Sequence, residues 1–159
     1  MLQPAPVQST YVRYQPIAQN GMLADETNSV TDSKTVETAA GIGFGLAVSQ
    51  GTNDRGVILG GTAFVGITRA DPTIGRADVS PALTLDSYPQ NDNAAVLAMG
   101  DIWVIPDNAV TAGEAVYYST TTGKLGHSGG TVIEDARWMT GAAAGALALL
   151  RLGNIAGNR

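Results

Sequence analysis

The chain has 159 residues, a net charge of −5 and only 14% charged residues, whereas roughly 25% is usual for soluble domains. This length suits one domain with one sizeable core and leaves little room for a second. The acidic balance and the nine scattered Lys and Arg residues argue against a nucleic-acid binder, and the absence of cysteine excludes disulfides and thiolate metal sites.

The shortage of charge also says something about association. Lys34 and Lys124 are the only lysines, and Ser, Thr, Asn, Gln and Gly supply most of the polarity. A free protein usually covers itself with charged side chains, whereas interfaces disfavour lysine because its long stem loses entropy when it is ordered. The composition therefore indicates a subunit of an assembly.

Neither a secretory signal nor a membrane span is expected. The first ten residues contain Pro4 and Pro6 and lack the apolar run that a signal needs. The longest apolar stretch, Met139 to Leu150, is shorter than the ~20 residues that cross a bilayer. We therefore expect a soluble protein that is made in the cytoplasm.

The first segment, Met1 to Ala40, is rich in polar residues and proline and shows no sustained apolar period, so it is predicted to be an extended N-terminal arm. Such an arm can be held by neighbouring chains or fold back along its own domain, and the sequence favours neither. Its apolar and aromatic residues have no core of their own, so docking into a groove on another subunit is the sharper hypothesis. The candidate partner-binding residues of the arm are Tyr11, Arg13, Tyr14 and Ile17.

From Gly41 onwards the pattern is that of short strands broken by turn residues. Ile42 to Ser49 alternates large and small side chains with a period of two, which predicts a half-buried strand. Val57 to Leu59 and Thr62 to Thr68, joined by Gly60-Gly61, are predicted to form a hairpin or a bulged strand pair.

A longer strand is predicted from Ala94 to Pro106. It is apolar on both faces at its end, as expected where one side meets the core and the other meets a partner. Trp103, in this part of the strand, is the fifth candidate partner-binding residue.

The remaining elements complete an all-β pattern. Glu114 to Ser119 and Lys124 to His127 are predicted to form a hairpin, and Ala136 to Thr140 and Ala146 to Leu152 to form two strands instead of one helix. The sequence thus predicts a compact β-barrel or jelly-roll-like sandwich. Its domain would span residues 41–152, between the arm at 1–40 and a C-terminal tail at 153–159.

Residues suited to catalysis or ligand binding are few. His127 is the only histidine and lies in a glycine-rich stretch, so a solvated loop is a better interpretation than a general base. The acidic pairs Asp25-Glu26 and Glu134-Asp135 are typical of solvated turns. Thr122-Gly123-Lys124 lacks the upstream glycine and the following Ser or Thr of a phosphate-binding loop, and the glycines from Gly41 to Gly45 open a strand and no helix. We predict no enzyme, no metal and no cofactor.

The aromatic residues offer a second route to function. Trp103, Tyr117, Tyr118 and Trp138 fall in predicted strands, where packing in the core is the default interpretation. If the first three formed an exposed platform instead, a tail- or fibre-associated β-sandwich that binds a host-surface glycan or protein would be the alternative function. A small hydrolase would need a cleft that brings His127 and carboxylates together.

Several turn and strand motifs carry a family resemblance. They are Met99-Gly100-Asp101-Ile102-Trp103-Val104, Pro106 to Val110, Thr111-Ala112-Gly113 leading to Val116-Tyr117-Tyr118, Thr122-Gly123-Lys124-Leu125, Ala136-Arg137-Trp138-Met139 and Ala144 to Leu152, with Gly41 to Gly45 upstream. In this order they resemble the structural cement, or capsid decoration, proteins of tailed bacteriophages. The resemblance covers roughly Gly41 to Leu152, whereas Met1 to Ala40 matches only loosely.

The resemblance implies a structural virion protein. Such a protein is expected to be a small β-barrel or jelly-roll-like domain, made in the bacterial cytoplasm and bound to the outer capsid surface. It is expected to act as a homo-oligomer, a dimer or a trimer, that bridges major capsid protein subunits. It would bind neither nucleic acid nor membrane.

Overall fold

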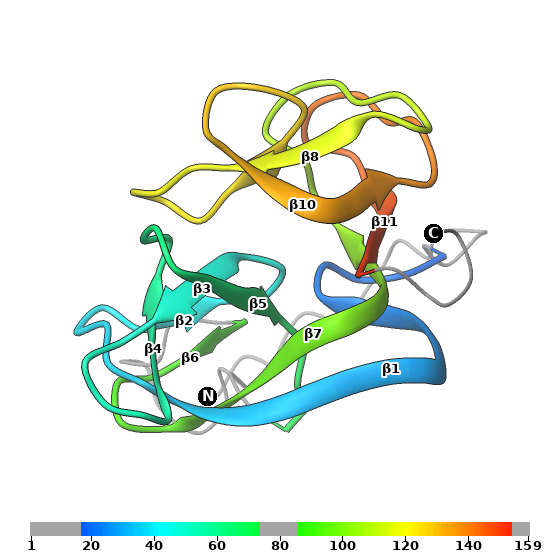
Figure 1. Cartoon of the computed structure of the whole chain (residues 1–159). Helices are drawn as coiled ribbons and strands as arrows, with labels where there is room; N and C mark the ends of the chain where they lie inside the picture. The colour runs from blue at the N-terminus through cyan, green and yellow to red at the C-terminus, as the bar shows by residue number, and fades with distance from the viewer. Residues whose placement is uncertain (1–16, 74–85, 154–159) are drawn as a thin grey trace, which may run out of the picture.

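The computed structural model describes residues 17–73 and 86–153, and every regular element within them is a strand (Figure 1). The prediction of an all-β fold is confirmed, and no helix among these residues is long and apolar enough to cross a membrane. The strands are β1 (Met22–Val36), β2 (Ile42–Gly43), β3 (Ala47–Gln50), β4 (Gly56–Leu59), β5 (Phe64–Thr68), β6 (Ser87–Tyr88), β7 (Asn93–Val104), β8 (Ala115–Tyr118), β9 (Leu125–Gly126), β10 (Thr131–Trp138) and β11 (Ala148–Leu152).

Strand β7 is the centre of the sheet. Along one edge it pairs with β1, from Thr35 opposite Asn93 to Met22 opposite Trp103. Its other edge is divided between β5 near the start and β11 near the end. Because the two strands share one edge of β7, the chain forms two lobes that β7 connects (Figure 1).

The first lobe is a closed ring of strands. The pairings run from β1 to β4, β3, β5 and β7, and the pairing of β7 with β1 completes the ring. Eight of its apolar side chains form a cluster of their own: Val36, Ile42, Phe44, Val48, Val57, Tyr88, Ala94 and Val96. The hydroxyl of buried Thr68 donates to Gly43 O and accepts from Leu46 N, which ties the turn between β2 and β3 to β5.

The second lobe extends from the end of β7 through β11, β10, β8 and β9. Its centre is Trp138, which is fully buried and donates its indole N–H to Gly126 O. The predicted hairpin of β8 and β9 and the two predicted strands near the C-terminus are confirmed. Strand β10 begins earlier than predicted because residues 131–133 pair with β8.

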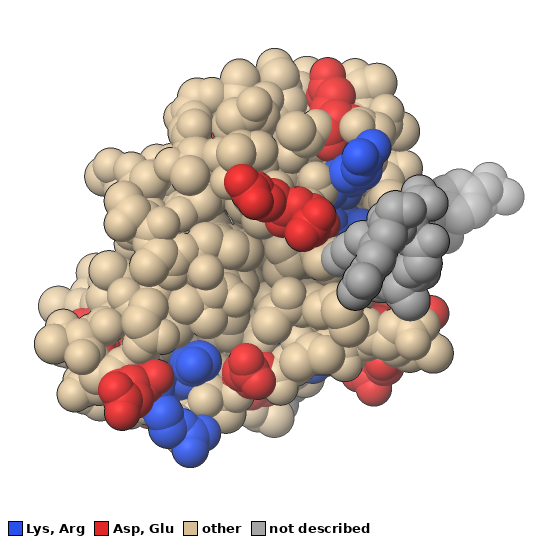
Figure 2. All heavy atoms as spheres, in the orientation of Figure 1, with Lys and Arg blue, Asp and Glu red and all other residues tan. Residues whose placement is uncertain are grey.

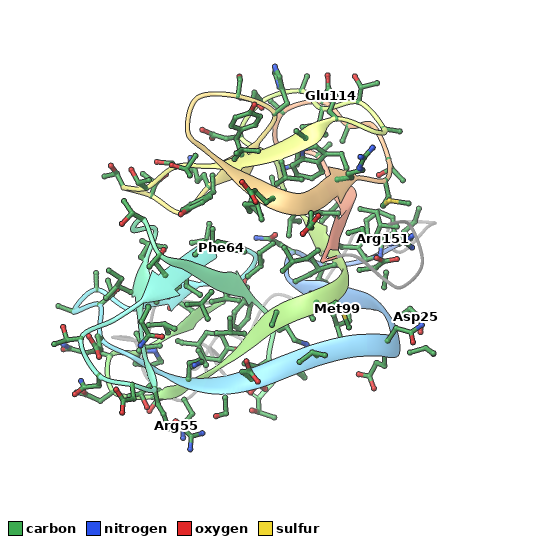
Figure 3. All side chains as sticks on the ribbon, viewed as in Figure 1. Asp25, Arg55, Phe64, Met99, Glu114 and Arg151 are labelled. Carbon is green, nitrogen blue, oxygen red and sulfur yellow. The ribbon has the colours of Figure 1, made fainter. Side chains whose placement is uncertain are left out.

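A shared apolar cluster, main-chain bonds and an aromatic contact join the lobes. Ala47, Ile67 and Leu97 from strands of the first lobe belong to the same core cluster as Trp138 of the second. Gly61 N donates to Thr120 O, and Ala47 N donates to Gly123 O, so the turn between β8 and β9 is fixed against β3 and the loop after β4. The rings of Phe64 and Tyr118 lie 5.3 Å apart between the lobes, where Figure 3 shows Phe64.

Two strand predictions were wrong in detail. Ile42 to Ser49 is not one strand, because Gly45 has a φ of 69° and turns the chain between β2 and β3. β4 and β5 are not a hairpin, because β3 lies between them in the sheet. Gly60 and Gly61 both have positive φ, and Gly60 N donates to Ala47 O, so this pair carries the chain across the end of β3.

The second half of the predicted arm folds back onto the domain. Residues 22–36 form β1, the longest strand, and only Leu23 and Val36 of this strand are buried. Backbone pairing with β7 holds the strand in place. Because few of its side chains are buried, its sequence shows no apolar period. The first sixteen residues of the arm lie outside the described residues, and for them the arm stays a prediction.

Gly66 tests whether the ring depends on close contact between β5 and β7. A Cβ there would lie 2.7 Å from Val96 Cγ1 and closer still to Leu97 O. We expect Gly66→Ala to lower the free energy of unfolding by about 1–3 kcal/mol in urea titrations, because backbone cannot move aside as a side chain can. Gly43→Ala is the control, since its Cβ would lie 3.3 Å from the flexible end of Leu46 and 3.8 Å from Asp86 O, which is ordinary van der Waals distance. Equal losses for both variants would contradict this account.

Candidate docking surface

The residues considered for catalysis or metal binding lie at the surface. The acidic pairs Asp25-Glu26 and Glu134-Asp135 are exposed, but the prediction that they lie in turns was wrong, because they belong to β1 and β10 at places where the strand register shifts. His127 is exposed, and its backbone N–H and Nδ1 both lie 2.9 Å from the side-chain oxygen of Asn108. The Asp25 carboxylate accepts the Thr27 backbone N–H, which lowers the pKa of Asp25. Within residues 17–73 and 86–153, no three or more of His, Asp and Glu gather where they could hold a metal ion.

The outward side of the second lobe's sheet is apolar. Trp103 in β7 lies between Met22 of β1 and Leu149 of β11, each directly opposite it in the register. Met139 N donates to Leu149 O at 2.7 Å and so continues this row to the end of β10. The row therefore crosses four strands on the side away from the core.

Two more apolar residues extend this row where the strands end. Ile105 and Leu147 follow the paired residues Val104 and Ala148, whose side chains are fully buried, so they point outward like Trp103 and Leu149. Met22, Ile105 and Met139 are 45%, 42% and 38% exposed, and the other three are half-buried. We call this set the apolar face; it consists of Met22, Trp103, Ile105, Met139, Leu147 and Leu149.

Charged residues border the apolar face on one side. Arg151 of β11 donates two hydrogen bonds of 2.7 Å to the two carboxylate oxygens of Asp101 on β7, and this pairing raises the pKa of Arg151. Asp25 lies opposite Asp101, and Arg137 lies opposite Arg151. On the face of the molecule that Figure 2 shows, acidic and basic side chains lie in a few separate groups on a mostly uncharged surface.

The segment before β1 enters beside the apolar face. Gly21 N donates to Trp103 O at 2.7 Å, and the side-chain oxygen of Asn20 accepts Ile105 N. Ile17 lies three residues before Asn20 in the sequence, and its side chain is 86% exposed. The structure thus brings the segment that carries Ile17 to the end of β7 that carries Trp103.

The other predicted site residues and aromatics have different places. Tyr11, Arg13 and Tyr14 lie outside the described residues. Tyr118 is 1% exposed and Trp138 is fully buried, which confirms their predicted core packing. The burial of Tyr118 excludes the platform of Trp103, Tyr117 and Tyr118 on which the host-binding alternative depended.

The sequence missed most of the apolar face. Leu147 and Leu149 show alternation, but alternation does not say which of its two sets of residues points outward. Met22 belongs to a stretch without an apolar period, and Met139 lies in the predicted strand Ala136 to Thr140, whose outward side the sequence does not identify. Only the cross-strand register brings these residues next to Trp103.

The fold and this surface define a class of protein. It is an all-β domain with little surface charge and an exposed apolar face, as in structural proteins that associate with other proteins. The family model for "Structural cement protein (E217 gp24/Pam3 gp6)" matches residues 7–153, so the chain belongs to this family of phage structural proteins. The resemblance stated from the sequence is confirmed.

Two solved structures are similar to this chain. "The capsid of Myoviridae Phage XM1" has a TM-score of 0.67 and 18% identity, over 94% of this chain and 98% of that chain, and this likeness shows the fold. "The crystal structure of head fiber gp8.5 N base in bacteriophage phi29" has a TM-score of 0.46 and 13% identity, over 78% of this chain and 95% of that chain, and it carries no argument. No curated protein matches the chain.

The apolar face should contribute little to folding, because its side chains are not in the core. We expect Met139→Ser to change the free energy of unfolding by less than about 1 kcal/mol. Leu150→Ala, one residue from Leu149 but fully buried, should lower it by about 2–5 kcal/mol. Urea unfolding of both purified variants gives the two values, and a large loss for Met139→Ser would show that the face belongs to the core.

Proposed function

We propose that the protein binds the outer surface of a phage capsid as an oligomer and stabilises the shell by bridging major capsid protein subunits. The observation that carries this proposal is the apolar face on an otherwise polar, weakly charged domain. Membership of the structural cement family supports it. The proposed partners are the major capsid protein and further copies of this chain, with no nucleic acid, membrane or cofactor, and no enzymatic activity.

The apolar face is suited to binding a protein surface. Covering Met22, Ile105 and Met139 removes apolar area from water, which stabilises a complex by about 25 cal/mol per Å². Trp103 adds a large rigid side chain near the centre of the patch, where interface energy usually concentrates. No lysine lies within the face, so binding orders few long charged side chains.

Oligomerisation multiplies weak contacts. In a dimer or a trimer, the first contact with the shell raises the effective concentration of the others, so each copy needs only modest affinity. Outward movement of capsid subunits under internal pressure then has to break several contacts at once. This is how a small domain without covalent links stabilises a large shell.

The N-terminal arm is proposed to provide a second contact. Ile17 is already exposed beside the end of β7 that carries Trp103. With Tyr11, Arg13 and Tyr14 it would dock into a groove of a neighbouring subunit, as an extension of the apolar face.

Heads that lack the protein test the proposal. We expect them to release DNA at a lower temperature than complete heads, and addition of purified protein should restore the release temperature. A Trp103→Ser, Leu149→Ser double variant should fail to restore the release temperature. The control variant Thr62→Ala, at an exposed position of the first lobe (the ring lobe), should restore it. Release temperatures followed by dye fluorescence give the comparison, and heads that are equally stable without the protein would refute the cement function.

A further inference from the structure

A groove lies next to the apolar face, where β10 separates from β8. Its volume is about 760 Å³, and it combines charged, apolar and small residues. Met139 and Arg151 belong to its walls, so it is continuous with the apolar face and with the charged border. Among the residues that line it are Gly113, Ala115, Val132 and Arg137.

The groove results from the strand register. Ile133 lies opposite Val116, but the next pair is Arg137 opposite Ala115, so β10 advances four residues while β8 advances one. The three extra residues of β10 form a large bulge, in which Asp135 has a φ of 60°. The facing side offers only Gly113 and Ala115, which are too small to fill the gap. The shape is therefore built into paired strands and is not a property of a loose loop.

The groove contains two arginines and two acidic residues, but among the described residues Arg137 has no ion-pair partner. Arg137 and Arg151 are direct cross-strand neighbours, and like charges in this arrangement repel each other. Both carboxylate oxygens of Asp101 accept hydrogen bonds from the guanidinium of Arg151, so this arginine is already paired. Arg137 is exposed and forms no ion pair with any of the described residues, including Glu134 and Asp135 of the same groove. A carboxylate from another molecule would complete the pattern.

Apolar side chains lie on either side of Arg137 along β10. Val132 is 42% exposed and Met139 is 38% exposed, and both line the groove. An occupant that places a carboxylate on Arg137 therefore meets apolar surface next to it. Glu134 and Asp135 disfavour a second acidic residue at their end of the groove.

We infer that this groove binds an extended segment of the major capsid protein that carries one acidic side chain beside apolar residues, with the carboxylate held by Arg137. Charge complementarity at Arg137 and continuity with the apolar face together favour this occupant. The inference rests on the proposed function, and it adds the chemistry of the partner segment and the residue that recognises it.

Charge reversal at Arg137 tests the inference. Labelled full-length protein is mixed with heads that lack it, and bound protein is measured after sedimentation over a series of concentrations and salt levels. We expect Arg137→Glu to weaken binding by about tenfold or more and Arg137→Ala to weaken it less, while Arg137→Lys keeps most of the affinity. The parent should also lose affinity with added salt more steeply than Arg137→Ala does.

Arg55→Glu is the matched control. Arg55 is an exposed arginine of the ring lobe, and Figure 3 shows it at the opposite end of the molecule from Arg151. The Arg55→Glu variant should bind phage heads with the same affinity as the parent protein. Because Arg137 is exposed and faces another arginine, its variants should unfold at the parent's urea midpoint, which shows that they fold.

The outcomes separate the two proposals. If the parent does not bind heads, the proposed function fails. If the parent binds and Arg137→Glu binds equally well, or if Arg55→Glu loses as much, only the groove's role is refuted. If Arg137→Glu abolishes self-association in sedimentation equilibrium but monomers still bind heads, the occupant is a second copy of this chain and the inference is overturned.

Discussion

The shared edge of β7 is the constraint on which the rest of the structure depends. A strand has only two edges, and β7 gives one to β1 and divides the other between β5 and β11. The two lobes therefore cannot be positioned independently. The same pairing fixes which side chains point inward, so Ile102 and Val104 are fully buried while Trp103 and Ile105 are left on the surface. The apolar face follows from the register of one strand.

Much of the fold could be predicted from local patterns. Alternation near the C-terminus and the turn at Gly123 identified β11 and the hairpin of β8 and β9, because those pairings are between neighbours in the sequence. The closing strand of the ring could not be found in this way. β1 buries only two side chains and is held by pairing with β7, from Thr35 opposite Asn93 to Met22 opposite Trp103, and no local pattern records so distant a partner.

The docking surface was predictable only in part, for the same reason. Trp103 was identified because its strand is apolar on both faces, and Ile17 because it is an apolar residue in a polar segment. Met22, Leu149 and Arg137 acquire their roles from residues opposite them on other strands. A single Arg in a strand reads as a solvated surface residue. It becomes unusual only when a second Arg, already paired with Asp101, is found beside it.

The low charge of the chain and Arg137, which has no ion-pair partner among the described residues, have complementary consequences. Apolar area gives affinity with little discrimination, since any apolar surface of the right shape can cover it. One unpaired guanidinium in a groove discriminates, because a partner without a carboxylate there would bury the charge without compensation. With charged residues at only 14% of the sequence, few other charges compete with that signal. For the proposed binding to a repetitive shell, an apolar face with a single charge requirement would give both the strength and the position of the contact.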